Sequence, residues 1–159
     1  MQDGREESEL ERLDRNLNEL LGELRVALPG VQVLFAFLLV APFNQRFGRT
    51  TDFERGLYFA ALLCTLLASI LLIAPTVIHR LEFRHGDKGY VVSTGNRLTI
   101  AGLIVLAAAM TCAITLVTGF LFGTAMAIVT ASFAVFAFVM IWFVVPLWRR
   151  RSVRSASGP

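Results

Sequence analysis

A long uncharged run between Leu98 and Trp148 constrains this chain more than any other feature of its sequence. About fifty consecutive residues pass without Asp, Glu, Lys, Arg or His, which is typical of membrane-spanning segments. One helix of that length would measure about 75 Å, against about 30 Å for the hydrocarbon core of a bilayer. The run therefore predicts two helices joined by a bend, which we place between Gly119 and Gly123.

Two further apolar segments precede this hairpin, and each is long enough to cross a bilayer. A composition of 55% hydrophobic and 17% charged residues agrees with a membrane protein. We therefore expect an all-α fold, an integral membrane four-helix bundle occupying residues 26–148, preceded by an acidic amphipathic helix in residues 1–25 and followed by a basic tail in residues 149–159. The expected spans are residues 26–43, 57–78, 98–118 and 124–148.

The basic residues predict the orientation of these spans. Of the 15 Lys and Arg residues, the first connection contains three, Arg46, Arg49 and Arg55, and the bend contains none. The others lie in the N-terminal segment, the second connection and the C-terminal tail, which by the positive-inside rule places both termini in the cytoplasm. This distribution also explains the net charge of +3, so we expect no nucleic-acid partner.

Leucines spaced alternately by three and four residues form one stripe before the first span. They are Leu10, Leu13, Leu17, Leu20 and Leu24. Two alternatives remain for this stripe: a contact between copies of the chain, or packing on the membrane surface or within the same chain. Its acidic neighbours argue against anionic lipid as the main partner of this segment.

Proline and glutamine interrupt the apolar pattern of the first two spans. Pro29 and Gly30 should kink or restart the first helix, and Pro75 should bend the second at a similar depth. Gln32 follows inside the hydrocarbon, where its amide requires a hydrogen-bond partner. We expect it to face another helix, a water-filled cavity or the carbonyls that the proline leaves unpaired.

The connection from His79 to Arg97 is the segment with the most varied chemistry, and we expect a loop with a possible short hairpin at Gly86–Gly89. Its basic side chains are candidates for contact with anionic lipid headgroups: Arg80, Arg84, Lys88 and Arg97. His79 and His85 lack further ligands, so we expect no metal site.

Small and hydroxyl-bearing residues mark faces of the third and fourth spans. Threonines recur on the third, and a small-residue stripe on the fourth includes Gly123, Ala127, Ala131 and Ala134. Such stripes let helices approach closely, and threonine hydroxyls bond back to their own helix. Cys64 and Cys112 are expected at similar depth as packing residues rather than as a disulfide.

Three segments carry a resemblance to a known family: the residues from Glu23 to Leu39 (ELRVALPGVQVLFAFLL), Ile73 to Arg80 (IAPTVIHR), and Asn96-Arg97. Over roughly residues 16 to 120 the chain resembles an uncharacterised family of small bacterial integral membrane proteins. The resemblance implies four membrane helices in a bacterial cytoplasmic membrane and carries no activity or catalytic residue.

The expected spans contain no ionisable carboxylate, amine or imidazole, which argues against an ion-coupled transporter. No set of catalytic or metal-ligating residues is evident, so we expect a non-enzyme without a cofactor. Two functions remain: a protein that acts by binding helices or lipids, including itself, and a homo-oligomeric pore. Candidate pore or intramembrane polar positions are Gln32, Asn44, Thr111, Thr115 and Thr118.

Overall fold

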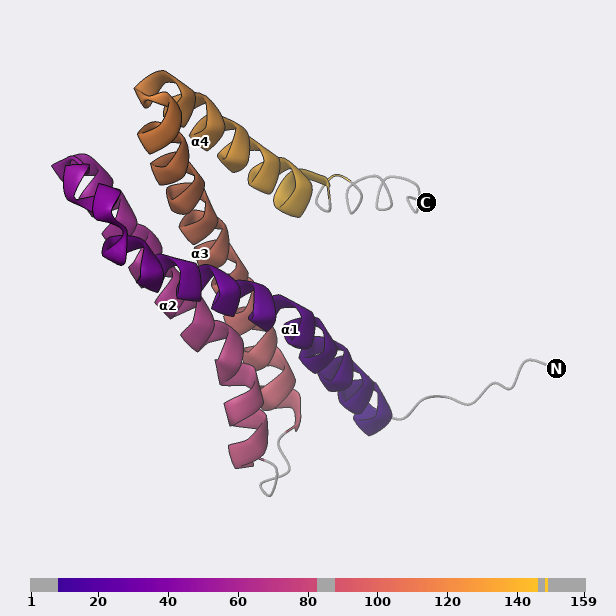
Figure 1. Ribbon diagram of the computed structural model, residues 1–159. Coiled ribbons are helices and arrows are strands. Elements are labelled where there is room, and N and C mark those ends of the chain that lie inside the picture. The colour runs from indigo at the N-terminus through magenta and orange to yellow at the C-terminus, as the bar shows by residue number, and fades with distance from the viewer. Residues whose placement is uncertain (1–8, 83–87, 146–147, 149–159) are drawn as a thin grey trace.

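Four α-helices make up most of the chain that the computed structural model describes, which comprises residues 9–82, 88–145 and 148. The helices are α1 (Glu9–Val40), α2 (Asp52–Glu82), α3 (Lys88–Phe122) and α4 (Thr124–Val139), and no strand occurs in this part. All four are long and apolar enough to span a membrane, which confirms the expected all-α fold (Figure 1). Residues 1–8 and the expected basic tail, 149–159, lie outside the described residues.

Three short helical segments complete the described part of the chain. The connection from α1 to α2 consists mainly of η1 (Ala41–Phe43) and η2 (Gln45–Arg49), and α4 continues into a π-helical segment, η3 (Met140–Val144). The candidate span at the C-terminal end is Thr124–Trp142, somewhat shorter than the expected 124–148.

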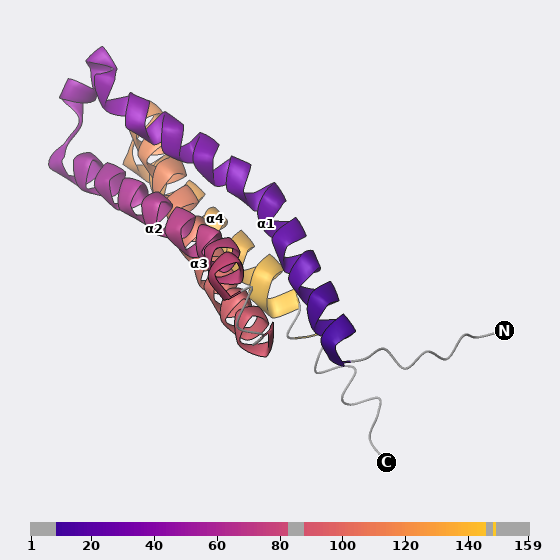
Figure 2. The ribbon, with the colours of Figure 1, turned by 90° about the horizontal axis from the view of Figure 1, so that it is seen from below.

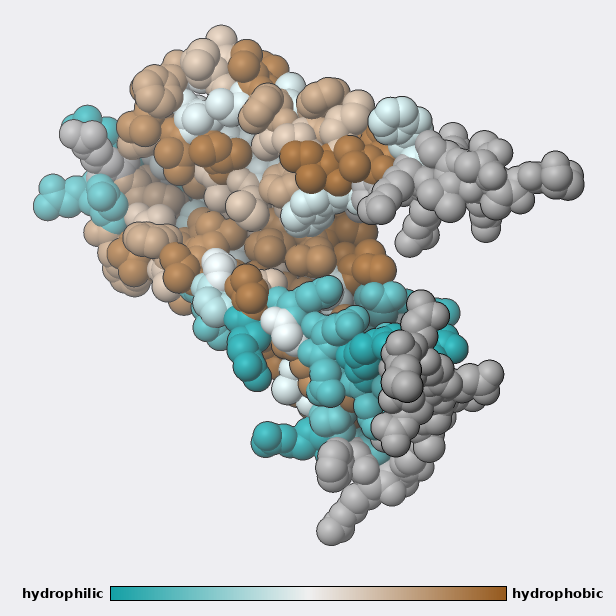
Figure 3. Space-filling model, turned by 90° about the vertical axis from the view of Figure 1, so that its right-hand side faces the viewer, coloured by the Kyte–Doolittle hydropathy of each residue, from teal (hydrophilic) through white to brown (hydrophobic). Residues whose placement is uncertain are grey.

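The first three helices are longer than a membrane requires. They contain 32, 31 and 35 residues. This corresponds to about 47–53 Å of helix, against about 30 Å of hydrocarbon. The start of α1, the end of α2 and the start of α3 lie at the same end of the molecule (Figure 1), and Figure 3 shows hydrophilic residues gathered at this lower end and hydrophobic residues over most of the remainder of that face.

The prediction of a loop between residues 79 and 97 is largely wrong. Only residues 83–87 separate α2 from α3, and they lie outside the described residues. The physical reason is packing beyond the membrane: Val91 is buried, and the backbone at Gly95 lies against Leu20 of α1 and Pro75 of α2. The leucine stripe of α1 thus supplies the apolar surface that keeps this part of α3 helical.

One row of side chains runs along α1 and packs against the rest of the chain. Leu17, Leu24, Val31 and Leu38 recur at seven-residue spacing, and all are buried. Because α1 contacts both α2 and α3, the stripe is covered within a single chain, and it continues through the membrane span. The best-buried cluster consists of Leu24, Val31 and Leu72, flanked by Leu21, Leu28, Leu103 and Leu106.

Both prolines of the helix interiors lie within uninterrupted helices. Pro29 is inside α1 and Pro75 inside α2. Of the two outcomes expected at Pro29 and Gly30, a kink or a restart of the helix, the restart does not occur, because the same row of leucines and valines packs on both sides of Pro29. A bend at Pro29 or Pro75 stays a prediction.

The tightest helix contact lies between α2 and α3 at Gly102. A Cβ atom at this position would lie 2.8 Å from Cγ and 2.9 Å from Cδ2 of Leu72, and 3.2 Å from Cβ of Leu71. α2 contributes small residues as well: Ala61, Thr65 and Ala68 are fully buried. Small residues let two helices approach closely in lipid, where dispersion contacts replace the hydrophobic driving force.

The bend between α3 and α4 occurs at a single residue. Gly123 has φ of +86°, a backbone conformation that residues with a Cβ atom rarely adopt. From this turn the two helices diverge (Figure 1). Among the described helices, α4 contacts only α3 and η3, the segment that continues α4. Ala127 of α4 is buried against α3: a Cβ atom built at Gly119 would lie 3.5 Å from the Cβ of Ala127. The face of α4 that carries Ala127, one residue of the expected small-residue stripe, is therefore turned toward α3.

Candidate functional site

The threonines of α3 satisfy their hydroxyl groups on their own helix. Thr111 Oγ1 donates to the carbonyl of Ala107 at 2.8 Å, and Thr115 Oγ1 donates to the carbonyl of Thr111 at 2.6 Å. Both side chains are half-buried. Neither hydroxyl therefore needs a partner on another helix.

Thr118 joins α3 to α4. Its Oγ1 lies 2.8 Å from Oγ1 of Thr130, and each hydroxyl also lies within hydrogen-bond distance of a carbonyl on its own helix, those of Ile114 and Met126. Thr118 is buried. Thr118 and Thr130 thus form a side-chain hydrogen bond that links α3 to α4.

We expect a double-mutant cycle of Thr118→Val and Thr130→Val to show coupling of about 0.6 kcal/mol, and no more than about 1.7 kcal/mol, because hydrogen bonds between membrane helices contribute this much. The measurement is unfolding of the purified protein in mixed micelles with increasing SDS. Thr124→Val, at an exposed position on α4, serves as the control. Additive effects of the two valines would contradict the contact.

Gln32 lies on the face of α1 that is turned away from the rest of the chain. Its side chain is exposed, and so are the neighbouring Pro29 and Gly30. Within the described residues the Gln32 amide has no hydrogen-bond partner. The expectation that it faces another helix is therefore not met inside this chain, because the buried row of α1 through Val31 and Leu38 fixes the rotation of the helix.

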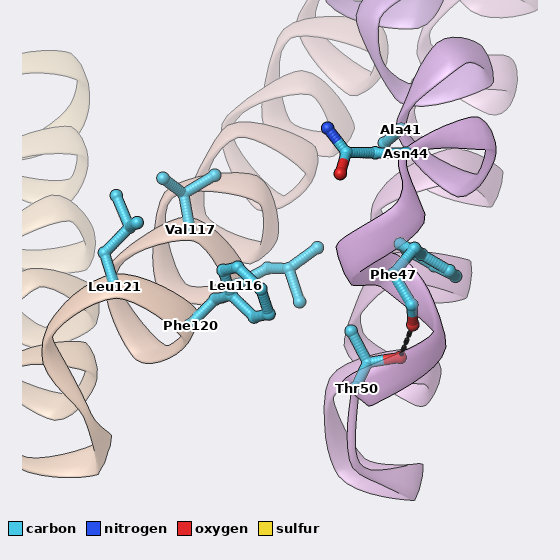
Figure 4. A pocket seen from close by; sticks show the side chains of 8 residues that line it. All are labelled: Ala41, Asn44, Phe47, Thr50, Leu116, Val117, Phe120 and Leu121. Atoms are coloured by element: carbon cyan, nitrogen blue, oxygen red, sulfur yellow. Dashed lines mark hydrogen bonds between the residues drawn. The ribbon is translucent and has the colours of Figure 1, made fainter.

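Asn44 borders a cavity at the end of the molecule where α1 is joined to α2. This α1–α2 end lies opposite the hydrophilic end, which is formed by the start of α1, the end of α2 and the start of α3 (Figure 1). The cavity measures about 360 Å³ and lies between the α1–α2 connection and the last turns of α3. In Figure 4 the side chain of Asn44 points from the connection toward α3. The remaining lining residues are Ala41, Phe47, Thr50, Leu116, Val117, Phe120 and Leu121.

A network of contacts holds the connection that forms one wall of this cavity. The Tyr58 hydroxyl donates to the carbonyl of Leu38 at 2.9 Å, and the rings of Tyr58 and Phe47 meet edge to face with centroids 5.1 Å apart. Thr50 Oγ1 donates to the carbonyl of Phe47 at 2.8 Å. Tyr58 of α2 therefore contacts both the end of α1, through Leu38, and the connection, through Phe47.

A capping box begins α2 beside this wall. The Thr51 amide donates to Oε2 of Glu54 at 2.7 Å, and the Glu54 amide donates to Oγ1 of Thr51 at 3.3 Å. The sequence Thr51-Asp-Phe-Glu54 carries this Thr-x-x-Glu signature. It is a local signal for the start of α2 several residues before Leu57, the start of the expected span. Tyr58 and Phe47 lack such a local signature, because their contact joins segments whose packing is tertiary.

The candidate headgroup contacts divide into described and undescribed positions. Arg80 near the end of α2 and Arg97 on α3 are both exposed at the hydrophilic end. Arg84 lies outside the described residues, and Lys88 is the first residue of α3, with its side chain outside them. The candidate self-association residue Leu10 lies in α1 and its side chain is likewise undescribed, whereas Leu13 is half-buried and Leu17, Leu20 and Leu24 are buried.

No group of three or more His, Cys, Asp or Glu residues that could hold a metal occurs among the described residues. Cys64 and Cys112 are both free and half-buried. The described part of the chain thus presents a cavity bordered by polar groups where α1 is joined to α2 and, at Gln32, an exposed amide without a hydrogen-bond partner among the described residues.

These observations define the class of multi-pass, all-helical membrane proteins, because the described residues form four helices that are each long and apolar enough to cross a bilayer. Its residues 6–146 match the model of a family described as Family of unknown function (DUF6328), and the chain belongs to that family. The resemblance to an uncharacterised family is thereby confirmed. No curated protein and no solved structure gives a significant match to the chain.

Proposed function

We propose that the protein is non-enzymatic and acts in the membrane through contacts with other helices and with lipids, with self-association as its principal contact. The observation that supports this most directly is the exposed Gln32 amide in the first span. Gln32 lies about 9 Å of helix beyond Val26, the first residue of the apolar segment, so it is well inside the hydrocarbon. An unsatisfied amide there costs several kcal/mol.

A second copy of the chain would satisfy this amide. Because a carboxamide both donates and accepts, two Gln32 side chains related by a two-fold axis can bond to each other. The surrounding face of α1 suits a close approach: Gly22, Pro29 and Ala36 recur at seven-residue spacing and all are exposed. Apart from the nearby backbone of α1 itself, no atom of the described residues lies within 4 Å of a Cβ built at Gly22 or Gly30.

The alternative function, a homo-oligomeric pore, has less support. Its five candidate residues lie in separate environments: Gln32 on the exposed face of α1, Asn44 at the end cavity, Thr118 in the α3–α4 contact, and Thr111 and Thr115 bonded to their own helix. A pore would require other copies of the chain to bring these groups to one axis. Permeation is therefore measured alongside assembly below.

We also propose that the hydrophilic end lies in the cytoplasm of a bacterial cell, with both termini there. The even number of spans supports termini on one side, and the positive-inside rule favours the cytoplasmic side. Arg80 and Arg97 are exposed at this end, which supports a contact with anionic lipid headgroups.

Replacement of the amide tests the proposal. In nanodiscs and in mild detergent, we expect native mass measurements to find an oligomer, and Gln32→Leu to weaken its association about 3- to 20-fold, which corresponds to one interhelical hydrogen bond. Gln45→Leu is the control, because Gln45 is an exposed amide outside the span. Chemical crosslinking at several protein concentrations gives the association constant.

Two outcomes would contradict self-association through Gln32. One is a wild-type monomer in both media, and the other is an unchanged association constant for Gln32→Leu. An intact oligomer with altered ion or solute flux in proteoliposomes would instead favour the pore.

A further inference from the structure

The cavity at the α1–α2 end has the dimensions of a site for a flexible chain rather than for a helix. Its volume is about 360 Å³, within the range of about 300–1,000 Å³ for small-molecule sites. A single helical turn, 5.4 Å long and about 10 Å wide, would occupy about 420 Å³. The cavity is too small to enclose even one helical turn, whereas the thinner acyl chain of a lipid can enter it with part of its length.

The walls of the cavity are apolar along α3 and polar at one edge. Leu116, Val117 and Phe120 of α3 form the apolar side, and Asn44 and Thr50 supply the polar side chains from the connection (Figure 4). An occupant that matches both has a long apolar part and a polar group at its end.

A cation stands next to the polar edge. Nε of Arg55 donates to Oγ1 of Thr50 at 3.4 Å, and the Arg55 side chain is 54% exposed, with a solvent-facing ion pair to Asp52 at 3.7 Å. Arg49, on the same connection, is exposed as well. An exposed ion pair of this kind is weak, so the guanidinium can also bind an anion that arrives at the edge.

The polar edge lies where the apolar sequence of the first candidate span ends, so we place it near the lipid headgroups. The first candidate span ends at Phe43, one residue before Asn44, and the second begins at Asp52. Leu116 and Val117 lie one to two turns before the end of α3, on the hydrocarbon side of this edge. Ester and phosphate groups of a lipid would meet Asn44, Thr50 and Arg55, while its acyl chain would meet α3.

We propose that this cavity binds one phospholipid of the adjoining leaflet, with an acyl chain against Leu116, Val117 and Phe120 and the phosphate beside Arg55. The wall is formed before a ligand arrives, because Tyr58 of α2 packs on Phe47 of the connection and donates to the Leu38 carbonyl of α1. Binding therefore needs little ordering of the protein, which favours retention of a single lipid. The site does not depend on self-association, since all its residues come from one chain.

The test uses nanodiscs of phosphatidylglycerol that contain a small fraction of the same lipid with a photoreactive diazirine in one acyl chain. We expect crosslinks to concentrate on residues 41–50 and 116–121. Val117→Phe fills the cavity and should reduce these crosslinks at least tenfold. The matched control is Val129→Phe, an exposed valine on α4 that lies outside the cavity and should change them less than twofold.

A second pair of variants tests the headgroup contact. Arg55→Gln should reduce labelling of the cavity about fivefold, because a single basic residue near the membrane surface contributes about that much to the binding of an anionic lipid. Arg49→Gln is the control for general charge at this end. Leu121→Trp fills the cavity from an exposed position, so it replaces Val117→Phe if that variant does not fold.

The proposal fails if labelling spreads evenly over the lipid-facing segments, including α4, or if both cavity-filling variants leave it unchanged. Labelling of the cavity that falls as the ratio of protein to lipid rises would assign the site to a second copy of the chain and would also overturn the proposal. Native mass reports on Gln32 and lipid labelling reports on the cavity, so either proposal can fail without the other.

Discussion

Gly102→Val is expected to lower the free energy of unfolding by about 3 kcal/mol, at the upper end of the range for overpacking a tight contact. A Cβ atom at this position meets Leu72 at 2.8 Å, closer than real Cβ contacts allow. Leu72 is itself fully buried and packed against Leu24 and Val31, so it has no space into which it can move. Relief of the clash requires separation of α2 and α3, the most extensive helix contact in the chain.

The measurement is reversible unfolding in mixed micelles as the fraction of SDS increases, followed by circular dichroism. Gly56→Val in α2 is the matched control, because no atom of the described chain lies within 4 Å of a Cβ built there. The control separates the clash from the general effect of a β-branched residue in a helix. Equal unfolding midpoints for Gly102→Val and Gly56→Val would contradict the close approach of α2 and α3.

Leu24→Ala is expected to cost about 2–5 kcal/mol of stability, the usual effect of truncating a buried leucine. Leu24 is 2% exposed and belongs to the cluster that joins the hydrophilic part of α1 to its membrane span. Val26→Ala, two residues later, is the control, because Val26 is 81% exposed. We expect that control to stay within about 0.5 kcal/mol of the wild type.

The same variant also distinguishes the two expectations for the leucine stripe. If Leu24 packs within its own chain, the loss of stability is independent of protein concentration. If the stripe joins two copies of the chain, the loss grows as the protein is diluted, because association contributes to the apparent stability by mass action. A strong concentration dependence for Leu24→Ala, absent in Val26→Ala, would show that the buried row is an intermolecular contact.

Sequence patterns predict some residues of the candidate site but not the cavity itself. Asn44 and Gln32 stand out because amides are rare within or beside apolar segments, and both were identified. The cavity beside Asn44 was missed, because it exists only where the end of α3 meets the α1–α2 connection, and no local pattern relates Leu116 or Val117 to Phe47. The edge-to-face contact of Phe47 with Tyr58 is likewise a product of tertiary packing.

The expected number of helices long and apolar enough to span a membrane was confirmed, but the helices end at other residues than the expected spans. The hydrocarbon selects apolar residues strongly, so the number of spans and the bend at Gly123 follow from the sequence. Helix ends beyond the membrane depend on packing instead: Val91 and the segment at Gly95 are helical because α1 and α2 cover them. A polar, glycine-containing sequence such as residues 79–97 does not reveal such cover, so the sequence alone predicts a loop there.

The sequence by itself determined that this chain has four helices long and apolar enough to cross a membrane and that it turns at a glycine. Tertiary structure alone decided which face of each helix packs and which faces the lipid. The reason is physical. In water an apolar stripe marks the buried face, as Leu17 and Leu24 do, but in hydrocarbon every face of a helix is apolar. Val31 and Leu38 therefore continue the buried row without any contrast in polarity to reveal it, and the outward direction of Gln32 follows from the packing of α1 on α2 and α3.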